Sequence, residues 1–139
     1  MKIYLASPFF NEKEIKYVEK AEQILRSRGF EVFSPREHEC RDEEPGSKVW
    51  AEKIFRGDLA GIDSCDRMVV LSHGAYSDSG TSWECGYAFA KGIPAAVVHV
   101  GEDANLMLTE GSFANLKMED LATYDFEAMP AKPYMGALF

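Results

Sequence analysis

Apolar residues recur along the chain in two patterns, as short continuous runs and at helical spacings of three or four positions. The short runs predict strands at Lys2 to Ala6, Glu31 to Phe33, Met68 to Leu71 and Ala95 to Val100. Helical spacing and end signals predict helices between Asn11 and Gly29, from about Ser47 to Ile62, from the region of Glu84 to Lys91, and from Met118 to Phe126, with another short element near Leu116.

This alternation of strands and helices predicts the fold class. Strand–helix–strand units cross over with a right-handed connection and build parallel sheets. We therefore expect a single α/β domain over residues 1–139, with a doubly wound, mainly parallel five-stranded sheet of flavodoxin or Rossmann-like type and helices on both faces. Neither an internal repeat nor a low-complexity tract indicates a second domain.

Ligands of such sheets bind beyond the carboxyl ends of the strands. That rule places Tyr4 to Phe10, Ser72 to Glu84 and Gly101 to Met107 around one site. The segment Arg36 to Gly46 is polar and aperiodic, and we expect it to be a loop that covers this site.

Composition restricts the partners. With 46% hydrophobic and 27% charged residues, the chain has the balance of a folded globular protein. The formal net charge of −8 disfavours nucleic acid polymers, because their phosphates are bound by Lys and Arg surfaces. No apolar run approaches the ~20 residues of a membrane span, and no cleavable leader is visible, so we expect no membrane partner.

Cysteine and histidine positions give no sign of a metal site. The three cysteines are odd in number and lack C-x-x-C spacing, which indicates neither a disulfide scaffold nor a zinc site and favours a reducing cytoplasm. His38, His73 and His99 share no metal-ligand spacing. Dinucleotide and nucleoside triphosphate loops are also absent, so no cofactor is expected.

Candidate chemistry gathers in the segment Asp78 to Ala88. We expect Glu84 in the first turn of a helix, whose positive end would keep it ionised, as a nucleophile requires. Small neighbours such as Gly80 leave room for a ligand, and Asp78 stands in the preceding loop. Carboxylates crowded in this way suit chemistry at a sugar carbon. The same residues also fit a purely structural interpretation, with a capping box from Thr81 to Glu84 and a turn at Asp78.

Asp58 is a polar member of an otherwise apolar row on one helix face, which consists of Trp50, Ile54, Asp58 and Ile62. A carboxylate in that position either points into a cavity or is a structural group bonded to loop amides.

Aromatic residues of the first strand and the turn after it leave a similar choice. Tyr4, Phe9 and Phe10 are either core residues or the walls of an apolar slot for a flat ring. Asp63 and Asp66, at a helix end and in a turn, are expected to be structural.

Over nearly its whole length the chain resembles the nucleoside 2-deoxyribosyltransferase family. The resemblance is carried by the opening Ile3 to Ala6, by Asp58, Leu59 and Ile62 on their helix, by the block Asp78 to Ala88, and by Asn105 to Met107.

Carried over position by position, the resemblance implies roles for these residues. Glu84 matches the nucleophile that attacks C1′ of a 2′-deoxynucleoside, and Tyr4 resembles the tyrosine that holds that glutamate. Asp58 and Asp78 match acids that line the deoxyribose and base pocket. Phe9 stands where an aromatic side chain faces the base.

The resemblance also implies an oligomer. Asn105 and Met107 match residues that reach into a neighbouring subunit's site, which implies a homo-oligomer such as a dimer or a trimer of dimers. Family members tend to place their terminal carboxylate near the base. The apolar ending Gly136 to Phe139 is compatible with docking there, which makes Phe139 a candidate for substrate binding.

The activity implied is exchange of the base between 2′-deoxynucleosides and free purines or pyrimidines, by double displacement with retention at C1′, in nucleotide salvage. Asp58 and the terminal carboxylate are the two candidates for protonating the leaving base. Two alternatives stay open: an N-glycosidase that hydrolyses nucleosides or their 5′-monophosphates on the same scaffold, and a non-catalytic nucleotide-binding module. A carboxylate at Asp78 favours a nucleoside, because it would repel a phosphate and can accept a hydrogen bond from a free 5′-hydroxyl.

Overall fold

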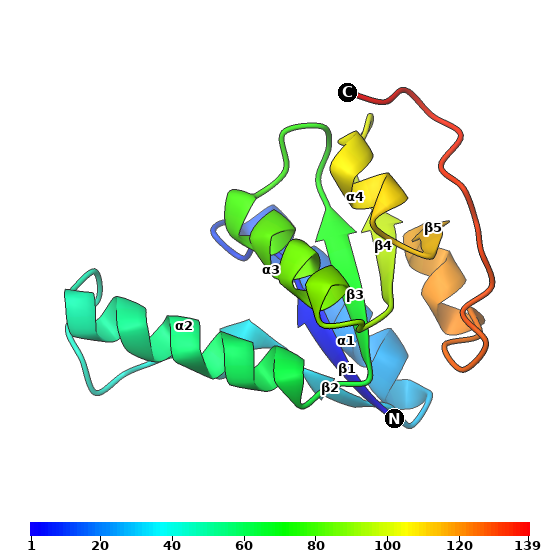
Figure 1. The fold of residues 1–139 in the computed structure, drawn as a ribbon. Helices are drawn as coiled ribbons and strands as arrows, with labels where there is room; N and C mark the ends of the chain where they lie inside the picture. Colours follow the sequence, from blue (N-terminus) through cyan, green and yellow to red (C-terminus); the bar gives the residue numbers. More distant parts are fainter.

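The computed structural model describes residues 1–139, which form one five-stranded sheet flanked by helices (Figure 1). The strands are β1 (Lys2–Ala6), β2 (Glu31–Phe33), β3 (Arg67–Ser72), β4 (Ala95–His99) and β5 (Ala114–Leu116). Every neighbouring pair is parallel, in the order β2-β1-β3-β4-β5. The predicted α/β fold with a doubly wound parallel sheet is confirmed.

Helices cover both faces of the sheet. On one face lie α1 (Glu12–Ser27) and the short 3₁₀ helix η2 (Met118–Ala122); on the other lie α2 (Lys48–Asp63), α3 (Ser79–Ala90) and α4 (Leu106–Glu110). Figure 1 shows α3 in front of the sheet, α1 behind it, and α2 extending away from the body of the domain. None of these helices combines the length and the apolarity that a membrane crossing needs.

The pleat of the strands divides the core in two. Successive side chains of a strand point to opposite faces. Ile3 and Leu5 of β1 therefore pack in the core beneath α1, whereas Tyr4 and Ala6 pack in the core beneath α2 and α3. Tyr4 thus enters the second core from β1, an interior strand that lies between β2 and β3.

The start of α1 follows the predicted cap. The Asn11 side chain accepts a hydrogen bond from the Glu14 backbone N–H at 2.9 Å. The Glu14 carboxylate in turn accepts from the Phe10 backbone N–H at 2.9 Å. These two bonds satisfy backbone donors that a helix start leaves free, and they fix the turn between β1 and α1.

The predicted helix from Met118 to Phe126 is wrong. Only η2 forms, and the chain then turns so that Tyr124 and Phe126 enter the core beneath α1. The Arg28 guanidinium donates to the carbonyl oxygens of Leu121 and Tyr124 at 2.7 and 2.9 Å. Those carbonyls therefore accept hydrogen bonds from Arg28 and not from a following helical turn. The apolar residues between 118 and 126 are spaced as in a helix because they belong to a buried loop.

A second difference is the one-turn helix α4, for which the sequence pattern gave no prediction. The Asn105 side chain caps it by accepting from the Met107 N–H at 2.9 Å.

The C-terminal tail runs along the outer edge of the sheet, as the red segment of Figure 1 shows. Lys132 exchanges backbone hydrogen bonds with Phe113 and Asn115 beside β5. At its end, the Phe139 N–H donates to the Ala104 carbonyl at 3.0 Å, and the Phe139 carbonyl accepts from the Leu106 N–H at 2.9 Å. The tail therefore docks, and it covers an edge strand that would otherwise expose unpaired backbone groups.

Candidate active site

A cavity of about 680 Å³ opens at the carboxyl ends of β1, β2 and β3. Its walls are residues 7–10 after β1, parts of the segment 35–45 after β2, one face of α2 and the start of α3. β1 and β3 are the adjacent strands from which the chain winds in opposite directions, where doubly wound sheets bind ligands. The segment Arg36 to Gly46, which begins within the 3₁₀ helix η1 (Pro35–Glu37), does line the site that it was expected to cover.

Glu84 and Tyr4 meet at this cavity. The Tyr4 hydroxyl donates a hydrogen bond to the Glu84 carboxylate, although the two residues are 80 positions apart in the chain. Tyr4 has no exposed surface, and burial together with the neighbouring acids raises the pKa of its phenol far above the usual range. Tyr4 is therefore a permanent donor, and it fixes one oxygen of Glu84 in place.

The expected position of Glu84 in the first turn of its helix is wrong. α3 begins at Ser79, so Glu84 lies in the second turn. The cap is Asp78, whose carboxylate accepts from both the backbone N–H and the hydroxyl of Thr81 at 2.8 Å. The alternative capping box from Thr81 to Glu84 is also wrong, because another acid occupies that role.

The expectation that the helix end keeps Glu84 ionised fails as well. Burial raises the pKa of Glu84 to about 7, against the lowering effect of the Tyr4 hydroxyl, and the nearby charges of Asp58 and Asp78 raise it further. The influence of the helix dipole is largely limited to the first turn, so burial prevails. Glu84 can thus gain or lose its proton near neutral pH.

Asp58 faces the same cavity from α2. Burial raises its pKa to about 6, and no hydrogen bond or ion pair offsets that effect. The alternative of a structural aspartate bonded to loop amides is therefore not what the structure shows. The predicted helix face that carries Asp58 is confirmed, because Trp50, Ile54 and Asp58 line the cavity together. Glu52 and Lys53, which lie off that face, are exposed.

Asp78 both caps α3 and lines the cavity. One of its oxygens, Oδ2, accepts both bonds from Thr81, while the residue also lines the cavity. Gly80, next along α3, lies at the same wall, and a Cβ atom there would stand 3.3 Å from Asp78 Oδ2. A larger residue at position 80 would therefore crowd the oxygen of Asp78 that caps α3.

The aromatic residues after β1 line the cavity as the slot interpretation predicts. Phe9 and Phe10 stack with ring centroids 6.2 Å apart, and Phe10 is largely exposed. His38 and Glu39 line the same cavity, whereas Glu37 pairs with Arg26 at 2.5 Å. Glu84 belongs to the lining as well.

Asn105 and Met107 do not reach this cavity. They line another cavity, of about 730 Å³, between α3 and α4, together with Tyr76 and Phe89. The prediction that the Gly101 to Met107 segment shares one site with Glu84 is wrong within a single chain, because α3 stands between the two cavities.

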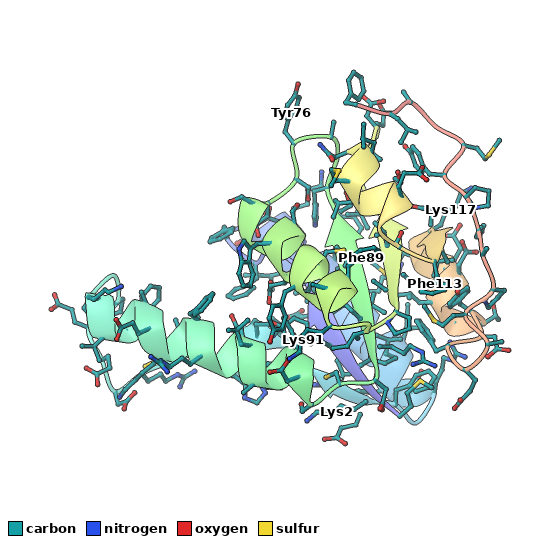
Figure 2. The ribbon with its side chains drawn as sticks, in the orientation of Figure 1. Lys2, Tyr76, Phe89, Lys91, Phe113 and Lys117 are labelled. Atoms are coloured by element: carbon teal, nitrogen blue, oxygen red, sulfur yellow. The ribbon has the colours of Figure 1, made fainter.

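Exposed apolar side chains mark this second cavity. Figure 2 shows Tyr76 projecting from the loop before α3 and Phe89 on α3 itself. Tyr76, Phe89 and Met107 are 98%, 68% and 75% exposed, so this chain alone leaves an apolar surface uncovered. Phe139 is docked beside it through Ala104 and Leu106, and it too is separate from the Glu84 cavity.

Other polar groups are structural. Asp63 accepts from the Tyr87 hydroxyl at 2.8 Å, and Asp66 accepts from the Lys2 backbone N–H at 2.8 Å, as expected for both. No group of three or more histidine, cysteine or acidic side chains is placed to hold a metal ion. Around Glu84 itself stand the carboxylates of Asp58 and Asp78 and the phenol of Tyr4.

The chain resembles known proteins in both sequence and fold. A family model described as nucleoside 2-deoxyribosyltransferase matches residues 3–125. A nucleoside deoxyribosyltransferase of Lactobacillus johnsonii is 34% identical over 105 residues, which cover 70% of each chain.

Two solved structures are informative. A 2-deoxyribosyltransferase from Bacillus psychrosaccharolyticus superposes with a TM-score of 0.91 at 42% identity, over 97% of this chain and all of that one. A CMP N-glycosidase of Clostridium botulinum superposes with a TM-score of 0.50 at 25% identity, over 71% of this chain and 69% of that one.

Proposed function

Since the chain belongs to the nucleoside 2-deoxyribosyltransferase family, and is thus an enzyme, we propose that it exchanges the base of 2′-deoxynucleosides through a covalent deoxyribosyl-glutamate. The observation that carries this proposal is the Tyr4–Glu84 hydrogen bond in a cavity that also contains Asp58 and Asp78. An oriented carboxylate with no cation beside it is suited to bond an electron-poor sugar carbon.

In the first step a Glu84 carboxylate oxygen forms a bond to C1′, while the bond from C1′ to the base nitrogen breaks. The electron pair of the breaking bond stays on the base, which takes a proton from the Asp58 carboxyl group. The transition state is oxocarbenium-like, and the acids that surround Glu84 stabilise its positive charge.

In the second step a nitrogen of the incoming base attacks C1′ from the vacated side. The ester bond breaks, its electron pair returns to Glu84, and the incoming base gives its proton back to Asp58. Two inversions give net retention. Neither step requires a metal or cofactor.

Glu84 must be ionised to attack and Asp58 must be protonated to donate. Burial raises the pKa of Glu84 to about 7 and that of Asp58 to about 6, so the single proton of the pair resides mainly on Glu84, and the reactive state is the minor one of the two. The two groups interact, so their apparent pKa values belong to the pair. We expect base exchange to be fastest near neutral pH, to fall at low pH with loss of the nucleophile, and to fall at high pH with loss of the acid.

Substrate selection is assigned to the cavity walls. Phe9 faces the base, and Asp78 uses the oxygen not engaged by Thr81 to accept from the 5′-hydroxyl. Gly80 leaves space for the sugar. The odd number of cysteines supports a reducing cytoplasm, where salvage of deoxynucleosides and free bases takes place.

A neighbouring copy completes the site in this proposal. The support is the exposed apolar surface around Tyr76, Phe89 and Met107, since surfaces of this kind mark protein contacts. Asn105, Met107 and the Phe139 carboxylate would then act on the partner's cavity, in a dimer or a trimer of dimers. Light scattering at several concentrations tests it, and a monomer at assay concentration would contradict it.

Incubation with deoxyinosine and free adenine tests the activity. Deoxyadenosine is the expected product. Hypoxanthine with free deoxyribose as the main products would favour the hydrolase alternative, which the similarity to a CMP N-glycosidase keeps relevant. Mass spectrometry of the denatured enzyme after mixing with substrate should locate the deoxyribosyl group on Glu84.

A further inference from the structure

Three aromatic rings form a continuous stack from the wall of the cavity to the tyrosine that holds Glu84. The Phe33 ring lies 5.4 Å from that of Tyr4, with an interplanar angle of 11°. His38 stacks on Phe33 at 4.2 Å and 2°. Tyr4 and His38 each touch the site, through Glu84 and the cavity wall respectively, whereas Phe33 does not line the cavity.

Gly61 of α2 shows how tightly Phe33 is held. A Cβ atom at position 61 would stand 2.7 Å from the Cε1 and Cζ atoms of the Phe33 ring. Cβ atoms in proteins do not approach other carbon atoms this closely, so only glycine at position 61 lets α2 lie this near to the Phe33 ring. Because Asp58 lies one helical turn before Gly61, the same contact sets how close the carboxylate of Asp58 comes to β1.

We propose that Phe33 is a positioning residue for base exchange: with Gly61 beside it, its ring holds Tyr4 under Glu84 on one side and His38 in the cavity wall on the other. This inference rests on the proposed function as far as turnover is concerned. Its geometric part concerns only the Tyr4–Glu84 bond and can be measured without substrate.

A residue that only filled the core would behave differently. Phe30, just before β2, is a suitable matched control because it packs on Phe126 in the opposite core, beneath α1. Loss of either ring costs packing. Only loss of the Phe33 ring removes a support of Tyr4.

Displacement of Tyr4 should change the pKa of Glu84. The Tyr4 hydroxyl lowers the pKa of Glu84, while burial, Asp58 from α2 and Asp78 from the start of α3 raise it. A misplaced Tyr4 therefore lets the pKa of Glu84 rise further. We expect the change in Phe33→Leu to be about one pH unit, the equivalent of one hydrogen bond to a charged group.

The experiment titrates isotope-labelled glutamate carboxyl carbons by NMR in the full chain, with the Glu84 signal assigned through its absence in Glu84→Gln. Phe33→Leu should raise the midpoint of Glu84, and Phe30→Leu should leave it unchanged. An unchanged midpoint in a folded Phe33→Leu variant would overturn the proposal.

Gly61→Ala gives an independent second variant, because its methyl group displaces the same ring. It should raise the Glu84 midpoint as Phe33→Leu does, while the double variant should show less than the sum, since the shorter leucine leaves room for the methyl group. Additive midpoint shifts would contradict the shared mechanism.

Turnover separates this inference from the proposed function. Phe33→Leu should lower kcat for exchange on the order of tenfold, move the acid limb of the pH–rate profile upward, and raise KM for the acceptor base through His38. Absence of exchange by the unmodified enzyme, together with a raised Glu84 midpoint in Phe33→Leu, would refute the proposed function and leave the positioning of Tyr4 supported.

Discussion

Glu22 and Glu84 are glutamates withdrawn from solvent on opposite sides of the same sheet, and their surroundings are opposite in charge. Glu22 lies on α1, is 4% exposed and accepts from the Ser34 hydroxyl at 2.6 Å. The Arg36 guanidinium donates to it twice, at 2.7 and 2.5 Å, and Arg26 stands 4.0 Å away. Every lone pair of Glu22 thus faces a donor or a cation.

Glu84 has one donor, the Tyr4 hydroxyl, and its charged neighbours Asp58 and Asp78 are acids. A buried carboxylate beside arginines is satisfied by the protein alone and holds segments together. A buried carboxylate among acids lacks a positive partner, which an oxocarbenium-like sugar supplies only in the transition state. The missing cation is what distinguishes a reactive glutamate from a structural one.

The largest expected effect follows from removing the charge of Glu84. Glu84→Gln should keep the fold and the Tyr4 contact but lower base exchange by at least about 10³-fold, because the amide cannot attack C1′. Glu22→Gln is the matched control on the other face of the sheet. Exchange by Glu84→Gln at a rate similar to that of Glu22→Gln would refute the assignment of the nucleophile.

Much of this fold could be predicted because its signals are local. The apolar run Lys2 to Ala6 coincides with β1, and the Asn11 cap marks the start of α1. Local pattern failed at 118–126, since the buried residues there belong to a loop whose carbonyls bind Arg28, a residue distant in the chain.

The sequence indicated which acids belong to the site better than it indicated how they are placed. The family resemblance and the Asp58 row indicated acids that do line one cavity, with Tyr4 bonded to one of them. Asn105, Met107 and Phe139, predicted for the same site, lie away from it in the single chain. The start of α3 was misplaced, because Thr81 to Glu84 has the pattern of a cap and Asp78 takes that role only in the folded chain. The Glu22–Arg36 pair and the Phe33 stack could not be predicted from the spacing of residues, because each joins residues from separate elements.

A second way to test the comparison is to remove the charge of Glu22. Glu22→Gln leaves Arg36 without its full partner at a buried site, so the free energy of unfolding should fall by about 3 kcal/mol. The kcat for exchange should change by less than about threefold, because the bond-forming groups lie on the other face. Chemical denaturation and steady-state kinetics measure the two quantities. A loss of kcat without a loss of stability would reverse the roles assigned to the two glutamates.

A third test uses the pH dependence of stability. The pKa of Glu84 is raised from about 4.5 to about 7 in the folded state, so its protonated form favours folding. That contribution is complete below pH 4.5 and is lost as the pH rises through 7. Glu84→Gln stays neutral throughout, and should therefore be more stable than the unmodified protein by roughly 2 kcal/mol at pH 8 and about equal to it at pH 4. Chemical unfolding at pH 4 and pH 8 measures the two free energies. If Glu84→Gln were less stable than the unmodified protein at pH 8, the charge of Glu84 would be stabilised by its surroundings, as that of Glu22 is.

Asp78 combines both roles, and it gives the smallest of these effects. Its Oδ2 caps α3 through Thr81, which is structural, while its carboxylate charge at the cavity is proposed to select a free 5′-hydroxyl. Asp78→Ser keeps a good helix cap and removes the charge, so the cap and the charge can be separated. The ratio of kcat/KM for deoxyinosine 5′-monophosphate over deoxyinosine should rise about tenfold, because a like-charge contact near 4 Å costs about 1 kcal/mol in water and more when partly buried. Asp78→Asn is the control that keeps the size of the side chain, and it should shift the ratio in the same direction. If neither variant changes the ratio, the charge of Asp78 does not select against phosphate, and its capping bonds to Thr81 account for it as a structural acid.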